Sequence, residues 1–353
     1  MLSQINTFEW RACMKNKITC LKKGRFLFFS VIFLLLLSFV SCKKKQHNDK
    51  WNDTLTAGII NIACDEDFKY LMDAEIDAFQ VHNNYQAIIN PIYSNENEVI
   101  RLLMEDSVRL ALTTRTLNAA EQKTAKEKQM LVQQYLIAFD GIALIANKTN
   151  PDSLISFSTI KKILTGEITD WSQINPHSTL GAIRVIFDGN QSGILRYVVD
   201  SLAKQTALSS QLYALNNTDE LIKKVGELPN AIGIVGFNLL DNENRWKESG
   251  LKDKFRIMRI GKEENLSLQN TYLPYSGDIK NEDYPLWRTV YVLLSDPKSG
   301  LSSGFSIFLA HEVGQMVILK SGLLPAVSDP QNQSVKIVDA YPDENNDTIN
   351  NNK

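Results

Sequence analysis

Short, continuously apolar segments alternate with helix patterns along most of this chain, and this alternation limits the possible folds more than any other feature. Strand-like segments lie at 58–64, 86–93 and 108–114, and amphipathic helix patterns follow the first two at 67–82 and 97–106. Apolar strands joined by helices of about ten or more residues are typical of parallel sheets covered by helices. The sequence therefore predicts an α/β fold.

The alternation continues through the rest of the chain. The predicted helices are 117–129, 192–204 and 302–322, and the predicted strands are 135–147 (with a bend or break at Asp140-Gly141), 185–187, 230–237 and 286–294. A length of 353 residues suits one large or two modest domains, and 44% hydrophobic residues suffice for a proper core.

The first 41 residues have the pattern of an export leader. A 15-residue apolar run at 26–40 follows three basic residues, and it is shorter than the roughly 20 residues of a membrane span. It ends in Phe-Val-Ser-Cys at 39–42, which resembles the lipobox of bacterial lipoproteins, whose cysteine is diacylated after cleavage. Cys42 is therefore the expected lipidation site. An uncleaved anchor is the alternative, and Met14 is an alternative start; in either case the body would lie outside the cytoplasm.

Charge and cysteine content narrow the functions of the predicted mature chain. Without residues 1–41, the 38 Lys and Arg fall to 32 and the 40 Asp and Glu to 39, so the formal net charge changes from −2 to −7. An acidic body is a poor candidate for binding nucleic acid, which favours a basic face. Cys64 is the one cysteine left besides Cys42, so no intramolecular disulfide is expected.

Three predicted strand-to-helix junctions are candidate anion sites. They contain Asp67-Phe68, the turn from Ser94 to Glu96, and the segment from Asp188 through Ser192 and Gly193. Ligands of open α/β sheets bind at the carboxyl ends of strands, where helix N-termini present free N–H groups. Plain helix capping explains the same residue types at any one junction.

A fourth candidate, Thr113-Thr114-Arg115, follows the predicted strand 108–114. Two hydroxyls and a planar guanidinium suit a tetrahedral oxyanion, with a surface salt bridge as the alternative. Motifs for catalysis are missing: His311-Glu312 lacks the second histidine of a zinc protease, and no nucleophile has a base beside it. We expect no enzyme activity, no metal and no cofactor.

Several motifs together resemble the Pst-type phosphate-binding proteins of ABC importers. Residues 136–174 contain Asp-Gly-Ile-Ala, Asn-Pro and a helix ending Thr-Gly-Glu-Ile-Thr-Asp-Trp, and further similar motifs lie at 230–237, 284–294 and 322–326. The resemblance covers residues 58 to about 328 in order.

The resemblance implies a type II periplasmic-binding protein fold, in which two α/β lobes joined by two crossing strands close on the ligand. The implied parts are a leader at 1–41, a polar tether at 42–54, lobe one at 55–140 and 285–330, lobe two at 141–284, and a partly disordered tail at 331–353.

The resemblance also implies a ligand site made of nine positions. They are Asp67, Phe68, Ser94, Thr113, Thr114, Arg115, Asp188, Ser192 and Gly193. At Asp188 the family usually has an arginine, and at Thr114 some members have an aspartate. Our hypothesis is that the two roles have exchanged lobes, so that Arg115 supplies the cation and Asp188 accepts a proton from the phosphate. In the alternative, Asp188 only pairs with Arg115 or caps a helix, and phosphate binding is lost.

The expected function is that of a monomeric lipoprotein of the cell envelope that captures inorganic phosphate for an ABC importer. Its expected partners are the permease and ATPase of that importer and, through the lipid anchor, the membrane. Two alternatives stay open: a binding protein for another oxyanion or small solute, and a surface lipoprotein that keeps the fold for sensing or adhesion.

Overall fold

The computed structural model describes residues 53–189, 192–203, 208–210, 212–215, 217–240 and 243–327. The predicted leader (1–41), Cys42, the tether up to residue 52 and the predicted tail (331–353) lie outside the described residues, as do Asn190 and Gln191. No helix in the described part of the chain is long and apolar enough to cross a membrane.

The first part of the chain forms a sheet with the strand order β2-β1-β3-β12. The strand β1 (Gly58–Asp65) runs parallel to β2 (Ala87–Ser94) and β3 (Leu110–Thr113). The strand β12 (Trp287–Leu294) returns from late in the chain to pair antiparallel with β3. Together with the helices packed on it, we call this part lobe one.

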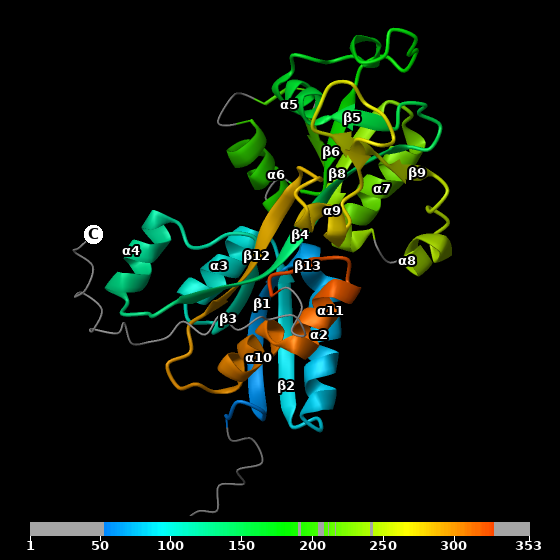
Figure 1. Ribbon diagram of the computed structural model, residues 1–353. Helices are drawn as coiled ribbons and strands as arrows, with labels where there is room; N and C mark the ends of the chain where they lie inside the picture. The colour runs from blue at the N-terminus through cyan, green and yellow to red at the C-terminus, as the bar shows by residue number, and fades with distance from the viewer. Residues whose placement is uncertain are drawn as a thin grey trace, which may run out of the picture. The chain divides into compact units, whose positions relative to one another are not determined.

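Lobe one has helices on both sides of its sheet, because strands that are apolar on both faces need cover on both. In Figure 1, α2, α10 and α11 lie beside β1 and β2, and α3 packs on β1 and β3. The helices of this lobe are η1 (Glu66–Phe68), α2 (Lys69–His82), α3 (Glu96–Met104), α4 (Ala119–Glu127), α10 (Leu301–Ala310) and α11 (Glu312–Lys320).

The strand β4 (Gln133–Asn147) connects the two halves of the structure. It is one continuous strand of 15 residues, so the predicted bend at Asp140-Gly141 does not interrupt it. Its first half pairs antiparallel with β12, where Asp140 lies opposite Arg288, and its second half pairs with β8. The two-residue strand β13 (Leu324–Pro325) also pairs with β4.

Lobe two is built on the second half of β4, in the strand order β4-β8-β6-β7. Its strands are β5 (Leu154–Ser156), β6 (Arg184–Phe187), β7 (Leu212–Ala214), β8 (Ala231–Gly236), β9 (Phe255–Ile257), β10 (Arg259–Gly261) and β11 (Thr271–Tyr272). Its helices are α5 (Phe157–Thr165), η2 (Trp171–Gln173), α6 (Gly193–Tyr197) with the π-helical turn η3 (Val198–Leu202), α7 (Thr218–Glu227), η4 (Phe237–Leu239), α8 (Glu243–Glu248) and α9 (Ser276–Lys280).

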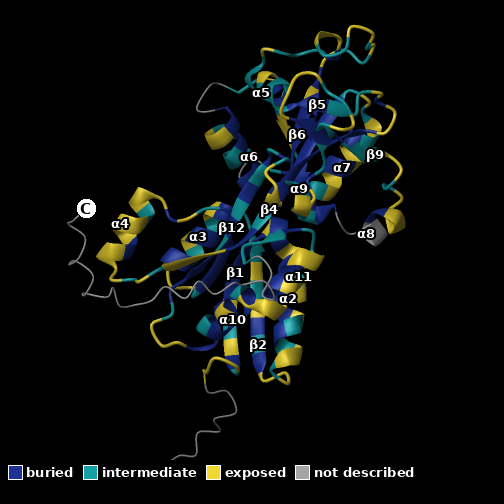
Figure 2. Ribbon diagram, viewed as in Figure 1, coloured by how far each residue is buried: buried dark blue, intermediate teal, exposed yellow. Residues whose placement is uncertain are grey.

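Each lobe has its own buried apolar clusters. Phe68 and Leu112 belong to a cluster of lobe one, whereas Trp171 and Phe187 belong to one of lobe two. Figure 2 shows the strands mostly buried and the outer faces of the helices exposed. These observations confirm the predicted α/β class. The lobe boundaries at 140–141 and 284–285 stay a prediction, because β4 continues unbroken through the first.

The prediction of one long helix over 302–322 is wrong, because this segment forms two helices, α10 and α11. His311 has extended backbone angles (φ −104°, ψ 175°) and separates α10 from α11. The second helix packs back on the end of the first, and a Cβ at Gly314 would overlap the carbonyl oxygen of Phe308. Buried Gln315 stabilises the break between the two helices, since its amide donates hydrogen bonds to the carbonyl oxygens of Leu309 and Ile137.

Glu75 on α2 is a buried carboxyl in the core of lobe one. Its residue is 0% exposed, and neither carboxyl oxygen has a hydrogen-bond partner among the described residues. Burial raises the pKa of Glu75 to about 9. The folded protein therefore holds Glu75 protonated at neutral pH, which opposes folding because the unfolded chain releases that proton.

Replacing Glu75 with apolar methionine should stabilise the protein by about 3–3.5 kcal/mol at pH 7, since pH 7 lies about 2.5 units above the ordinary pKa and each unit costs about 1.4 kcal/mol. The raised pKa also makes the wild-type stability fall as pH rises from about 4.5 to about 9, and Glu75→Met should remove this slope. Urea denaturation at three pH values in that window measures both effects. Glu127→Met, at an exposed site on α4, is the control and should change stability by less than about 0.5 kcal/mol. An unchanged pH slope in Glu75→Met would contradict the prediction.

Candidate functional site

The turn after β1 places two of the predicted site residues, Asp67 and Phe68, at the edge of lobe one. Asp65 ends β1 and accepts a hydrogen bond from the backbone N–H of Asp67 at 3.2 Å, which fixes the turn into η1. Asp65 is 2%, Asp67 4% and Phe68 0% exposed. Two carboxylates so close in a buried turn need a cation beside them.

Arg288, the second residue of β12, supplies that cation. Its Nη2 donates to Asp67 at 2.8 Å, and its Nε donates to Asp140 at 3.0 Å. Asp140 is its neighbour in the β4–β12 register, and the ring of Phe68 lies with its centroid 5.1 Å from the guanidinium carbon. The Nη1 group is buried and has no hydrogen-bond partner among the described residues.

The tip of α6 brings lobe two onto this guanidinium. A Cβ at Gly193 would lie 2.9 Å from Thr114 Oγ1, 3.1 Å from Arg288 Nη1 and 3.2 Å from Asp65 Oδ2. Such close approach requires glycine. Asn238, just after β8, makes a second link by donating to the carbonyl oxygen of Asp67 at 2.9 Å.

Four buried aspartates surround Arg288, and we call this group the Arg288 cluster: Asp65, Asp67, Asp140 and Asp188 with Arg288. Burial acting alone would lower the pKa of Arg288, but Asp67, Asp140 and Asp65 outweigh it and raise the pKa, so the guanidinium stays charged. Burial raises the pKa of Asp140 to about 6 against the opposing effect of Arg288. Burial and Asp67 raise the pKa of Asp188 to about 8, and burial also raises that of Asp65. Asp188 therefore keeps its proton at neutral pH, and Asp140 takes one up as the pH falls to about 6.

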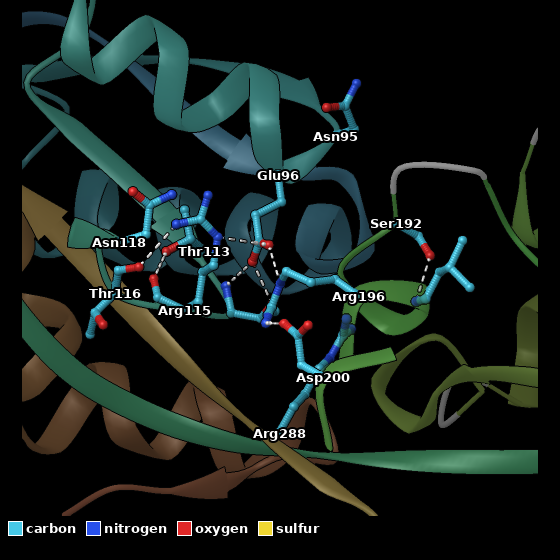
Figure 3. Close-up of polar contacts among 12 residues, drawn as sticks. Asn95, Glu96, Thr113, Arg115, Thr116, Asn118, Ser192, Arg196, Asp200 and Arg288 are labelled. Carbon is cyan, nitrogen blue, oxygen red and sulfur yellow. Dashed lines mark hydrogen bonds and ion pairs between the residues drawn. The ribbon is translucent and has the colours of Figure 1, made fainter. Parts of the chain in front are cut away.

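A second polar group joins the lobes beside the cluster. Glu96, the first residue of α3 and 2% exposed, accepts from the backbone N–H of Thr114 at 2.9 Å. Arg196 on α6 donates from Nε to Glu96 at 2.7 Å and from Nη2 to Thr114 Oγ1 at 2.8 Å. Figure 3 shows Arg196 reaching Glu96 from the opposite lobe. Burial opposes ionisation of Glu96, but Arg196 and Thr114 outweigh it and lower its pKa, so the pair stays ionised.

Arg115 has a different partner from the one that the sequence suggested. Its Nη1 and Nη2 donate to the two carboxylate oxygens of Glu121 at 2.7 and 2.8 Å, and its Nε lies 3.5 Å from Glu96. The arginine that acts on the Asp188 carboxyl is Arg288. The structure therefore gives no contact for the predicted exchange between Arg115 and Asp188, because Glu121 already holds the guanidinium fork.

The other predicted site residues fall into two groups. Phe68 and Gly193 lie against the Arg288 cluster, Thr114 lies next to Gly193, and Asp67 and Asp188 are part of the cluster. The hydroxyl of Thr113 donates to the carbonyl oxygen of Arg115 at 2.7 Å, away from the cluster. The hydroxyl of Ser192 caps its own helix at Leu195, and it also acts on Asp188, since its hydrogen bond opposes the rise in the pKa of that carboxyl. Ser192 lies apart from the Glu96 contacts in Figure 3. Ser94, at the end of β2, lies opposite Asp65 in the strand register.

Arg288, Asp65, Asp140 and Arg196 were not predicted, whereas Glu96 lies in the predicted turn from Ser94 to Glu96. The sequence does contain an indication of Arg288, because it is a charged residue inside the apolar strand pattern Leu-Trp-Arg-Thr-Val-Tyr-Val-Leu-Leu. Arginine is rarely buried without a charged partner, so such a residue indicates a carboxylate nearby. The aspartate of the Asp-Gly-Ile-Ala motif, Asp140, is that partner.

Three comparisons relate the chain to known proteins. A model of the PBP superfamily domain matches residues 52–313. The phosphate-binding protein PstS of Borreliella burgdorferi is 22% identical over 302 residues, covering 83% of this chain and 96% of that protein. Protein SphX of Synechococcus elongatus is 25% identical over 194 residues, and this match covers 54% of each protein, about half the relative's length.

The structure is similar to a crystal structure from Clostridium perfringens, named as a phosphate ABC transporter substrate-binding protein with bound phosphate. The TM-score is 0.61 with 21% identity, over 76% of this chain and 100% of that chain. Because the sequence identity is only 21%, this structural similarity is evidence for the fold alone. It confirms the type II periplasmic-binding protein fold.

Replacing Arg288 with methionine should destabilise the protein by about 3–5 kcal/mol, because Asp67 and Asp140 would be left buried without their cation. Urea denaturation at pH 7 measures the loss. The double variant Arg288→Met/Asp140→Asn should lose less than the sum of the single variants, since one of the stranded charges is gone. If the free energy of unfolding of Arg288→Met lay within about 0.5 kcal/mol of the wild-type value, the Arg288 ion pairs would not be what stabilises the packing of β12 against β4 and the turn after β1.

Replacing Arg196 with alanine should shift the protein without ligand toward separated lobes, because Glu96 and Thr114 lose their partner from lobe two. A charged hydrogen bond contributes about 1.5–3 kcal/mol, enough to change an open–closed equilibrium by tenfold or more. Small-angle X-ray scattering should give a larger radius of gyration for Arg196→Ala. Arg101→Ala is the control, since Arg101 pairs with Glu98 and Glu105 of its own helical segment within lobe one. Identical scattering from Arg196→Ala and wild type would argue against this link.

Proposed function

The chain belongs to the PBP superfamily, and we propose that it captures inorganic phosphate between its two lobes as the substrate-binding protein of an ABC importer. Proteins of this family bind solutes and are not enzymes. The proposal for phosphate draws on the names of the relatives and on the chemistry of the Arg288 cluster. The observation that carries it is the free Nη1 of Arg288.

Arg288 Nη1 is a charged donor that is buried, unpartnered among the described residues, and next to the tip of α6. Leaving such a donor unsatisfied is costly, so a ligand oxygen in that position would be strongly favoured. An oxyanion could also accept from the first N–H groups of the α6–η3 helical segment, where the helix dipole favours negative charge. Thr114, which already receives a hydrogen bond from Arg196, lines the same point.

The acidic residues of the cluster would select a protonated oxyanion. The charge of Arg288 is already balanced by Asp67 and Asp140, so a further anion needs neutral neighbours. Asp188 meets this need, since its pKa of about 8 leaves it protonated and able to donate at neutral pH. The unpartnered Oδ2 of Asp65 could accept a hydrogen bond from a protonated phosphate, whereas sulfate has no proton to donate.

In this proposal the protein is exported and held at the cell envelope by a lipid on Cys42, and it delivers phosphate to a permease and its ATPase. These statements depend on the leader and lipobox pattern of residues 1–42. The described residues begin after that segment, so this part of the proposal is carried by the sequence.

Isothermal titration calorimetry with phosphate and sulfate tests the proposal. Phosphate affinity should fall as pH rises through about 8, because Asp188 then ionises and repels the anion. Above that pH the loss should approach about tenfold per pH unit for one linked proton. Sulfate should bind at least tenfold more weakly than phosphate at pH 7.5.

Asp188→Asn supplies the matched variant, because asparagine has nearly the same shape and does not titrate. Its phosphate affinity should lose the pH step near 8. No detectable binding of phosphate by the wild type, or sulfate binding as tight as that of phosphate, would contradict the proposal.

A further inference from the structure

A groove of about 440 Å³ lies between α9 of lobe two and α11 of lobe one, and we call it the α9–α11 groove. The short strand β13 packs on both helices, which lie on either side of it in Figure 1. The apolar residues that line the groove are Met316, Leu319, Leu324, Pro325 and Val327.

The groove is separate from the proposed anion site. The side chain of Asp140 on β4 points toward Arg288, and the next residue, Gly141, faces the other side because successive residues of a strand alternate. A Cβ at Gly141 would overlap Pro274 and crowd Ile279 of α9. The helix α9 therefore lies on the face of β4 that is turned away from the Arg288 cluster.

The turn at β13 connects the two lobes beside the groove. Leu323 belongs to an apolar cluster of lobe one, whereas Leu324 packs against a cluster of lobe two. The hydroxyl of Ser276 on α9 donates to the carbonyl oxygen of Leu323 at 3.1 Å. An occupant that contacts both walls of the groove would stabilise this arrangement of the lobes relative to any in which the walls separate.

The α11 wall presents uncovered apolar side chains. Met316 is 47% and Leu319 is 45% exposed, and their spacing of three residues puts them on the same face of the helix. Exposed apolar groups that line a concave surface indicate a binding site. The volume is near the lower end of the roughly 300–1,000 Å³ of small-molecule sites, so it suits a few side chains of an extended segment.

The chain itself leads out of this groove. Val327, the last of the described residues, lines the groove, and its N–H donates to Oε1 of Gln315 at 3.0 Å. In the residues that follow, 335–341 (Val-Lys-Ile-Val-Asp-Ala-Tyr) contains five apolar residues, whereas the rest of 328–353 contains one, Ile349. Eight residues separate Val327 from Val335 and span up to about 27 Å when extended, which is enough to return to the groove.

The charges of the groove match those of this segment. Lys280 on the α9 wall and Glu312 on the α11 wall are exposed, and neither has an ion pair with another described residue. The segment carries Lys336 and Asp339 among its apolar residues. Asp339 would pair with Lys280. Lys336 would then pair with Glu312, and two such exposed pairs would fix the direction of the segment more than its affinity.

We propose that residues 335–341 of this chain occupy the α9–α11 groove, with their apolar side chains against Met316 and Leu319, and thereby bridge the two lobes. The proposal goes beyond the proposed function and does not depend on it, because no ligand at the Arg288 cluster enters the argument.

Hydrogen–deuterium exchange of the full chain without ligand, read by mass spectrometry, tests the proposal. Relative to the intrinsic rate for each sequence, amides of 335–341 should exchange at least tenfold more slowly than those of 343–353. Met316→Asp should abolish this difference, because a carboxylate in the groove disfavours contact with apolar side chains. Val81→Asp is the control, since Val81 is a 58% exposed apolar residue on α2 outside the groove. Equal rates in the two parts of the wild-type tail, or a difference that survives Met316→Asp, would overturn the proposal.

A variant of the segment gives the reciprocal readout. Ile337→Asp should speed the exchange of amides in α9 and in 323–327 by at least threefold, because the groove loses its cover. Ile349→Asp makes the same chemical change outside the segment and should leave these amides at the wild-type rate. Faster exchange in both variants, or in neither, would contradict docking by 335–341.

A charge exchange tests the direction of docking. Asp339→Lys should speed the exchange of the same amides by about two- to fivefold, and adding Lys280→Asp should restore the wild-type rate. If the double variant exchanges as fast as Asp339→Lys alone, the pairing of Asp339 with Lys280 is wrong.

Two other occupants would give different results, and either would overturn the proposal. If a second copy of the chain fills the groove, light scattering will show a wild-type dimer that Met316→Asp converts to a monomer. If a small apolar molecule fills it, native mass spectrometry of the wild type will show an added mass that Met316→Asp lacks.

Discussion

The buried ion pairs of Arg288 hold together the parts of this protein that matter for its function. Arg288 lies on β12, and its partners are Asp140 on β4 and Asp67 after β1, so three separate segments meet at one guanidinium. The strands β4 and β12 are also the ones that link the two lobes. The same residue therefore lies between the linking strands and in the proposed ligand site, and movement of the lobes would directly change its surroundings.

The excess of carboxyl groups around this one cation decides the chemistry of the site. Because the Arg288 cluster has four aspartates, some of them hold protons near neutral pH, as the raised pKa values of Asp188 and Asp140 indicate. The neighbouring link between Glu96 and Arg196 stays ionised, because its charges are matched. The site thus combines a fixed ion pair across the lobes with a group whose charge depends on pH and on the ligand.

Much of the fold could be predicted from local patterns, and much less of the site. Strands and helices of lobe one appear within two or three residues of their predicted bounds, since apolar periodicity is a local property. The long helix 302–322 failed because the break at His311 depends on packing of α11 against the end of α10. Among candidate site residues, Asp67, Asp188 and Gly193 do meet at Arg288. Arg115 looked equally suitable, but Glu121, six residues later, holds it instead.

The sequence by itself determined the α/β class and the family, because the alternation of strands and helices and the motifs from Asp140 to Trp171 are written in consecutive residues. Only the tertiary structure decided which charged side chains pair with one another. Arg288 follows Asp140 by 148 positions and Asp67 by 221, and nothing local shows that these side chains converge. A charged pair depends on distance in space and on the exclusion of water, and both are set by how the strands pair and the lobes meet.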